Sequence, residues 1–214
     1  IIQPTVGVIT NIGSAHQENF NTLDEKVEEK LKLFHDTDVI IYPADDPTIA
    51  RCVAAGNYSG RHMAWSQKDP DAPLYISRID KSGSETKISY IYNKGESQTY
   101  TLPFIDEASV ENSITCLAVC LTLGLAAKRI DEGMANLEPV AMRLEVKQGQ
   151  HGCTLINDSY NSDINSLDIA LDFISRRPDH KGRRRTLILS DIPQSGLAKE
   201  QLYREVSDLC VKRG

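Results

Sequence analysis

The fold is decided near the start of the chain by residues 6–42, VGVITNIGSAHQENFNTLDEKVEEKLKLFHDTDVIIY. Val6–Ile9 is a short apolar run typical of a buried strand, and Asp38–Tyr42 is a second run of this kind. Between them, apolar side chains recur three or four positions apart from Leu23 to Phe34, which is the spacing of one helix face. Strand, helix and strand in this order predict parallel neighbouring strands, and therefore an α/β fold.

Farther along, the pattern changes to alternation of polar and apolar side chains. Residues 87–92 and 98–102 alternate on either side of a turn at residues 93–96, which predicts a β-hairpin within residues 74–102. Two helices are then expected, and the first ends at a glycine. They are Ser113–Leu123, followed by Gly124, and Ile130–Leu137.

A second unit is expected to begin after Arg143. Its predicted elements, in chain order, are the strand Thr154–Ile156, the helix Ser166–Ile174, the strand Thr186–Leu189 and a helix over Leu202–Val211. This βαβα order predicts a second small α/β domain. We therefore divide the chain into residues 1–142 and residues 143–214.

Composition excludes several classes of protein. Hydrophobic residues make up 40% and charged residues 25% of the 214 residues, as in ordinary globular proteins. The net charge of -6 disfavours a nucleic-acid binder, because phosphate binding requires a basic surface. No apolar run reaches the length of a membrane span, so we expect no membrane insertion and a soluble, cytoplasmic protein.

The five cysteines do not suggest a disulfide framework or a zinc site. They form no CxxC pair, and their odd number suits disulfide pairing poorly, so we expect reduced thiols. Cys116 and Cys120 lie one helical turn apart in an apolar stretch, which predicts that both pack in the core.

Two residues near the start of the chain could carry chemistry. His16 lies just beyond the first strand, where open parallel sheets collect their ligands, but a lone loop histidine is more often a hydrogen-bonded surface residue. Lys30 lies in a helix rich in Glu and Lys, where a solvated, salt-bridged face is the usual arrangement. Residue chemistry alone favours the structural interpretation of both.

Their combination changes this interpretation. The run Thr10-Asn11-Ile12-Gly13-Ser14-Ala15-His16, with Lys30 fourteen positions after the histidine, resembles the central ATPase domain of the Mur ligase family. The resemblance implies that His16 binds Mg²⁺ and that Lys30 is carbamylated. An ammonium group would repel the metal, whereas a carbamate offers the hard oxygen donor that Mg²⁺ accepts.

Two further motifs extend the resemblance. Asn112, at the start of an apolar helix, corresponds to an asparagine that contacts adenine in the family, although the Gly-x-His-Asn that usually precedes it is Asp-Glu-Ala-Ser here, residues 106–109. Met142-Arg143-Leu144-Glu145 resembles the family's Arg-Leu/Met-Glu signature, which implies that Arg143 approaches the ATP phosphates and belongs to the catalytic set with His16 and Lys30.

The most specific motif is Asn157-Asp158-Ser159-Tyr160-Asn161, followed by Ser166. It resembles the Asp-Ser-Tyr-Asn-Ala-Asn-Pro-x-Ser motif of the D-alanyl-D-alanine-adding branch, which implies that Asp158, Tyr160 and Asn161 bind the nucleotide, with Asp158 near the ribose. The chain departs from that motif at Ser162 and at Ile164-Asn165. A turn that caps the following helix is the structural alternative.

The resemblance covers nearly the whole chain and implies an ATP- and Mg²⁺-dependent amide ligase. Its partners would be UDP-N-acetylmuramoyl tripeptide and D-alanyl-D-alanine, joined through an acyl phosphate. The implied fold is the later part of the ATPase domain, with a mainly parallel sheet and a hairpin region, followed by part of a Rossmann-like carboxyl-terminal domain. The segment Ser190–Gly196 resembles the form of the enzyme that is fused to an alanine racemase.

The sequence contains no Gly-x-x-x-x-Gly-Lys-[Ser/Thr] phosphate loop. We therefore expect the chain to be a piece of a longer enzyme and to be inactive by itself. Two alternatives remain open at this stage. One is a non-catalytic α/β scaffold that lost its phosphate loop, and the other is a folylpolyglutamate-type ligase of the same superfamily.

Overall fold

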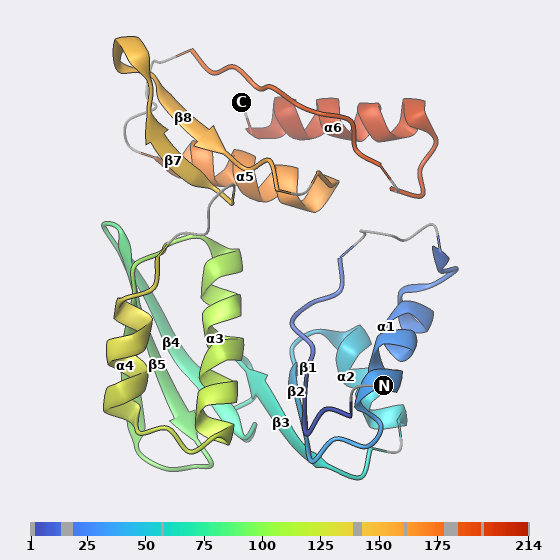
Figure 1. The fold of residues 1–214 in the computed structure, drawn as a ribbon, viewed down its shortest axis with the longest axis vertical. Helices are drawn as coiled ribbons and strands as arrows, with labels where there is room; N and C mark the ends of the chain where they lie inside the picture. Colours follow the sequence, from blue (N-terminus) through green and yellow to red (C-terminus); the bar gives the residue numbers. More distant parts are fainter. Residues whose placement is uncertain are drawn as a thin grey trace. The chain divides into compact units, whose positions relative to one another are not determined.

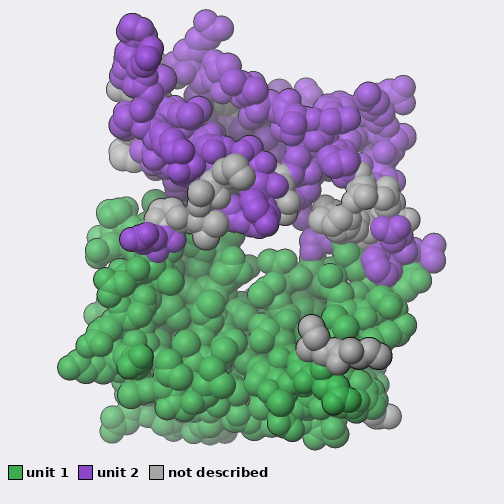
Figure 2. Space-filling view, in the orientation of Figure 1, with its two compact units in different colours: residues 1–12, 22–137 green, residues 13–21, 138–214 purple. Residues whose placement is uncertain are grey.

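The chain folds into two compact units. The computed structural model describes residues 3–13, 19–56, 58–138, 143–160, 162–177, 184–193 and 195–213. The first unit comprises residues 1–12 and 22–137, and the second comprises residues 13–21 and 138–214 (Figure 2). Within the described residues, no helix combines the length and the apolarity needed to cross a lipid bilayer.

The first unit is built on a six-stranded sheet whose strands follow one another in chain order. Strands β1 to β4 pair in parallel, and β4, β5 and β6 pair antiparallel. The strands are β1 Val6–Val8, β2 Val39–Pro43, β3 Arg61–Ser66, β4 Leu74–Ser82, β5 Glu85–Tyr92 and β6 Ser97–Leu102. The predicted parallel sheet with a hairpin region is confirmed, and β3 and β4 are strands that the pattern did not predict.

Helices cover both faces of this sheet (Figure 1). Because successive side chains of a strand point to opposite faces, β2 divides its apolar residues between two cores. Val39 and Ile41 pack with α3 Glu107–Thr122 and α4 Ala127–Ala135. Ile40 packs with α1 Leu23–Leu31 and α2 Pro47–Ala55 on the other face. The sheet is therefore the middle layer of an α/β/α arrangement.

The helix ends follow capping residues more closely than they follow apolar periodicity. The predicted helix over residues 23–34 is confirmed, although its last three residues form the 3₁₀ turn η2 Lys32–Phe34. Helix α3 begins six residues before the predicted start, because Asp106 Oδ1 accepts a hydrogen bond from Ser109 N at 2.8 Å. It ends as expected before Gly124, whose φ is +75°.

The expectation that Cys116 packs in the core is wrong. Cys116 is exposed and Cys120 is partly buried. Helix α3 buries Val110, Ile114 and Leu117 toward the sheet, and Cys116 lies outside that stripe. An apolar run on a helix is therefore not buried at every position.

A buried tyrosine makes the stability of the first unit sensitive to high pH. Tyr100 is 1% exposed, and its hydroxyl lies 2.9 Å from Ser113 Oγ, which itself donates to Val110 O. Burial raises the pKa of Tyr100 above its usual range. Since the folded pKa is raised, the neutral phenol favours folding below pH about 10 and loses that contribution as the pH rises further.

Tyr100→Phe is therefore expected to destabilise the protein by about 0.5–1.5 kcal/mol near pH 7, through the lost hydrogen bond. The difference between wild type and variant should shrink above pH 10. Urea unfolding followed by the fluorescence of Trp65, the only tryptophan, would measure both. A difference that stays constant from pH 7 to pH 11 would contradict this account.

The second unit contains a small hairpin and two helices. Strand β7 Glu145–Gln148 pairs antiparallel with β8 Thr154–Asn157, and the short turn η3 Gln150–Gly152 lies between them. Helices α5 Ile164–Arg176 and α6 Lys199–Arg213 follow. Leu167 of α5 forms a buried core with Leu202 and Val206 of α6 and with Ile192, which precedes α6. Arg213 Nε also donates to Asp168 Oδ1 at 2.8 Å and links α6 to α5.

The strand predicted at Thr186–Leu189 is wrong. Residues 184–192 form no strand, and Ile188 is 90% exposed. A strand requires a ladder partner, and the partner of β8 is β7, which the pattern did not predict. Leu155 of β8 and Leu187 line the same cavity of about 890 Å³, so the two segments face a common space instead of sharing hydrogen bonds.

Candidate functional site

The predicted site residues of the first unit lie on two helices. Lys30 is exposed in the last turn of α1, and Asn112 is exposed in α3. Because α1 and α3 cover opposite faces of the sheet, the fold does not bring these two side chains together. His16 lies outside the described residues.

The surroundings of Lys30 bear on metal binding. Lys26, one turn earlier, is only 4% exposed, and burial together with the charge of Lys30 lowers its pKa. An ammonium group offers no lone pair to a cation. Among the described residues, no group of three or more His, Cys, Asp or Glu side chains could hold a metal ion. A carbamate on Lys30 would add oxygen atoms of the kind that Mg²⁺ accepts.

In the second unit the fold brings Arg143, Asp158 and Tyr160 together. The Arg143 guanidinium carbon lies 4.3 Å from the centroid of the Tyr160 ring, a cation–π distance. Leu144 N donates to Asp158 Oδ1 at 3.1 Å. Burial raises the pKa of Asp158, while the hydrogen bond from Leu144 and the charge of Arg143 oppose that rise. Asn161 lies outside the described residues.

The backbone beside Arg143 adopts an unusual conformation. Leu144 has a φ of +48°, a region that residues other than glycine rarely occupy. Its N–H is the group that Asp158 binds, so the carboxylate holds the strained residue in place. Asp158 therefore orients the chain segment that carries Arg143, in addition to lying beside it.

The structural alternative for Asp158–Asn161, a cap on the following helix, is wrong for Asp158. Helix α5 is capped by Asp163, whose Oδ1 accepts from Ser166 N at 2.9 Å and whose Oδ2 accepts from Ser166 Oγ at 2.6 Å. Asp158 is bound by Leu144 instead. The Asp158 side chain therefore lies beside Arg143, which is exposed, and Tyr160, which is 56% exposed. Such a group of side chains suits a ribose and its phosphates.

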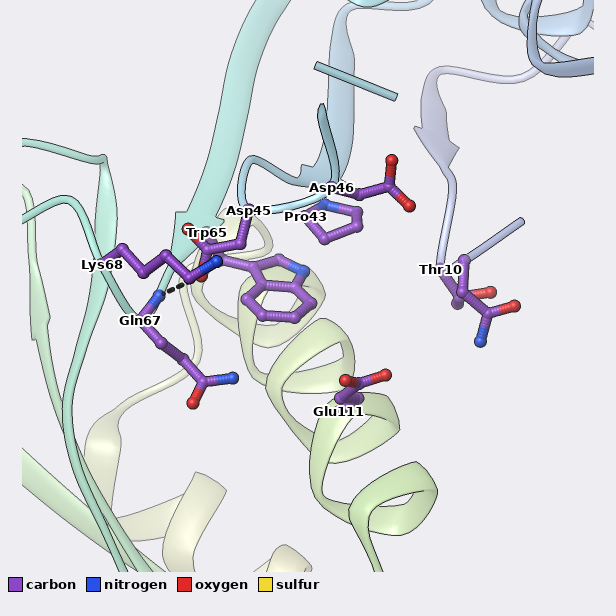
Figure 3. Close-up of a pocket in the computed structure, with 9 residues that line it drawn as sticks. Thr10, Pro43, Asp45, Asp46, Trp65, Gln67, Lys68 and Glu111 are labelled. Carbon is purple, nitrogen blue, oxygen red and sulfur yellow. Dashed lines mark hydrogen bonds between the residues drawn. The ribbon is translucent and has the colours of Figure 1, made fainter. Parts of the chain in front are cut away.

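A cavity of about 340 Å³ lies at the carboxyl ends of β1, β2 and β3 (Figure 3). This is where open α/β sheets bind their ligands. Its lining residues come from the ends of the three strands and from α3. They are Thr10, Asn11, Pro43, Asp45, Asp46, Trp65, Gln67, Lys68 and Glu111.

Sequence reasoning did not single out this cavity. Asp45 and Asp46 follow the second predicted strand, and Trp65 lies in the unpredicted strand β3. Both aspartates are fixed by backbone groups, since Asp45 Oδ2 accepts from Gln67 N at 2.7 Å and Asp46 Oδ1 accepts from Thr48 N at 2.9 Å. A paired carboxylate directly after a strand was the signal that could have indicated a site.

Comparison with known proteins places the chain in a family. The profile of the "Mur ligase middle domain" matches residues 1–120. The UDP-N-acetylmuramoyl-tripeptide–D-alanyl-D-alanine ligase of Bacillus subtilis is 24% identical over 211 residues, which are 96% of this chain and 43% of the relative. The corresponding ligase of Escherichia coli is 22% identical. The alignment covers all of this chain and 47% of the length of that ligase. The chain thus spans less than half the length of these relatives.

Solved structures show the same fold. The structure of MurF from Acinetobacter baumannii superposes with a TM-score of 0.79 at 23% identity. The superposition covers 99% of this chain and 44% of the MurF chain. MurF ligase from Thermotoga maritima in complex with ADP gives a TM-score of 0.74 at 20% identity. That superposition covers 98% of this chain and 46% of the Thermotoga chain. Since the middle-domain profile matches more than half of the residues, the chain belongs to the Mur ligase family.

Proposed function

We propose that this chain is part of an ATP-dependent ligase that joins D-alanyl-D-alanine to UDP-N-acetylmuramoyl tripeptide in the cytoplasm. The observation that carries the proposal is the alignment with tripeptide–D-alanyl-D-alanine ligases over 96% of the chain or more, through both units. Because those relatives are about twice as long, the activity belongs to a longer polypeptide that contains residues 1–214.

The proposed reaction has two steps. A carboxylate oxygen of the tripeptide attacks the γ-phosphorus of ATP, which forms an acyl phosphate and releases ADP. The amine of D-alanyl-D-alanine then attacks the acyl carbon, loses a proton and displaces phosphate as the amide bond forms. The first step concentrates negative charge on the transferred phosphoryl group, so catalysis depends on cations held in place near it.

The residues of the second unit support the nucleotide part of this proposal. The exposed guanidinium of Arg143 can donate two parallel hydrogen bonds to phosphate oxygens, and Tyr160 supports it from one side. Asp158 Oδ1 accepts from Leu144 N, and Oδ2, which accepts from no residue in the described part of the chain, could accept from a ribose hydroxyl. Asn161 would complete this set, and Asn112 on α3 would contact adenine.

His16 and a carbamylated Lys30 would hold Mg²⁺. When bound, the ion would neutralise charge on the phosphates of ATP. The hydrogen-bond capacity of the lysine changes with carbamylation, because three donors are replaced by an N–H and two acceptor oxygens. The alanine racemase fusion inferred from Ser190–Gly196 stays a prediction.

The test is phosphate release by the full polypeptide. UDP-muramoyl tripeptide, ATP and Mg²⁺ would be supplied with and without D-alanyl-D-alanine, and in parallel a folate with glutamate. Release that requires the dipeptide supports the proposal. Release only with the folate pair would favour the folylpolyglutamate-type alternative, and no release with either pair would favour a non-catalytic scaffold.

A further inference from the structure

Helix α1 carries a buried lysine one turn before Lys30. Lys26 is 4% exposed, whereas Lys30 is exposed. Burial of a charged lysine is costly, and lysine is almost never buried so completely unless it is paired. Burial lowers the pKa of Lys26, and the charge of Lys30 lowers it further, so the two ammonium groups repel each other. The helix therefore holds two like charges within electrostatic reach.

Helix geometry directs the Lys30 side chain toward Lys26. Residues four positions apart are neighbours on a helix surface, and helical side chains lean toward the amino-terminal end of their helix. The other residues at contact spacing from Lys30, three or four positions away, are Val27, Leu33 and Phe34, and none of them ionises. Lys26 is therefore the one ionisable residue at contact spacing from Lys30 along the helix.

The acidic residues next to Lys30 in the chain do not take the place of Lys26. Glu29 forms an ion pair with Lys32, and both side chains are largely exposed. Glu28 lies two positions before Lys30, and residues two positions apart on a helix do not face each other. The charge that a modified Lys30 side chain meets first is therefore the positive charge of Lys26.

Carbamylation would reverse the sign of the charge at Lys30. The neutral amine nitrogen attacks the carbon of CO₂, a nitrogen–carbon bond forms, and one proton leaves the nitrogen for water, which gives a carbamate anion. That anion would lie in the last turn of α1, which ends at Leu31, and the helix dipole disfavours negative charge there. A carbamate at this position therefore requires a positive charge close by.

We propose that Lys26 is a positioning residue for the carbamate of Lys30: its ammonium pairs with the carbamate, raises the fraction of Lys30 that is carbamylated, and orients the carbamate oxygens. The pair is repulsive before carbamylation and attractive after it, so the charge of Lys26 favours the modified state in both ways. An ammonium has three donors, and Lys26 can therefore donate to the carbamate and also to another partner. The inference rests on the proposed function, because that function supplies the carbamate on Lys30.

The experiment measures the carbamate directly, without nucleotide or metal. The full polypeptide would be equilibrated at constant pH with increasing concentrations of ¹³C-labelled CO₂, and the carbamate ¹³C resonance of Lys30 would be identified by its absence from Lys30→Ala. Lys26→Met, which keeps the length of the side chain and removes its charge, is expected to raise the CO₂ concentration for half occupancy by about three- to tenfold. Lys26→Arg keeps the charge and should remain close to wild type.

Lys32→Met is the matched control, because Lys32 is an exposed lysine two positions after Lys30 and pairs with Glu29. It should leave the occupancy of the carbamate unchanged. Since the proposed pair is electrostatic, added KCl should lower the occupancy more in wild type than in Lys26→Met. Lys26→Gln is measured as a second neutral variant, and urea unfolding shows whether each variant is folded.

The possible failures are distinguishable. If a folded neutral variant reaches half occupancy at the wild-type CO₂ concentration, or if Lys26→Arg loses as much occupancy as Lys26→Met, the charge of Lys26 has no such role. If neither neutral variant folds, a wild-type occupancy that is insensitive to KCl refutes the pairing. If wild type forms no carbamate at any CO₂ concentration, the carbamate role of Lys30 and this inference fail together, whereas the ligase function is still decided by dipeptide-dependent phosphate release.

Discussion

Lys30→Ala is expected to lower the rate of dipeptide-dependent phosphate release by about 10²- to 10³-fold, the loss typical when one group that stabilises the transition state is removed. The reason is that alanine cannot be carbamylated, so a ligand that would hold Mg²⁺ is lost. Lys30 is exposed at the end of α1, and the substitution should leave the fold unchanged. The assay is phosphate release by the full polypeptide with saturating substrates.

Lys32→Ala is the matched control. Lys32 lies two residues later, is exposed, and forms an ion pair with Glu29 on the same surface, so its loss should leave the rate nearly unchanged. A direct readout is the mass of the wild-type protein analysed in bicarbonate, because carbamylation of Lys30 adds the mass of CO₂. Equal rates for Lys30→Ala and Lys32→Ala would refute the carbamate role.

Arg143→Ala should lower kcat by about 10²-fold, since the guanidinium is proposed to stabilise charge on the transferred phosphoryl group. Arg143→Lys should fall between wild type and alanine. It keeps the charge but loses the two parallel hydrogen bonds and the stacking on Tyr160. ADP formation at saturating ATP and tripeptide would measure this effect.

Arg204→Ala, at an exposed position of α6 in the same unit, controls for the loss of a positive charge. It should retain the wild-type kcat. If Arg143→Ala instead raises KM for ATP and leaves kcat unchanged, Arg143 contributes to binding equally in the ground state and the transition state, and the catalytic role is wrong.

Local sequence patterns predicted the elements that depend on neighbouring residues. The periodicity of residues 23–34 and the alternation of residues 87–92 lie within single elements, and both were confirmed. The start of α3 was displaced because a side-chain cap, Asp106, sets it independently of the apolar stripe. The strand predicted at residues 186–189 failed because an apolar run does not identify the ladder partner that a strand requires.

The sequence by itself determined the α/β order of the first unit and the motifs by which the chain resembles its family. Only the tertiary structure decided which of the site residues meet. It joined Arg143 to Asp158 and Tyr160 through the hydrogen bond of a strained leucine, and it placed Lys30 and Asn112 on helices over opposite faces of the sheet. It also buried the indole N–H of Trp65, which meets no acceptor among the described residues. These arrangements depend on contacts between residues far apart in the chain, and periodicity reports only on neighbours.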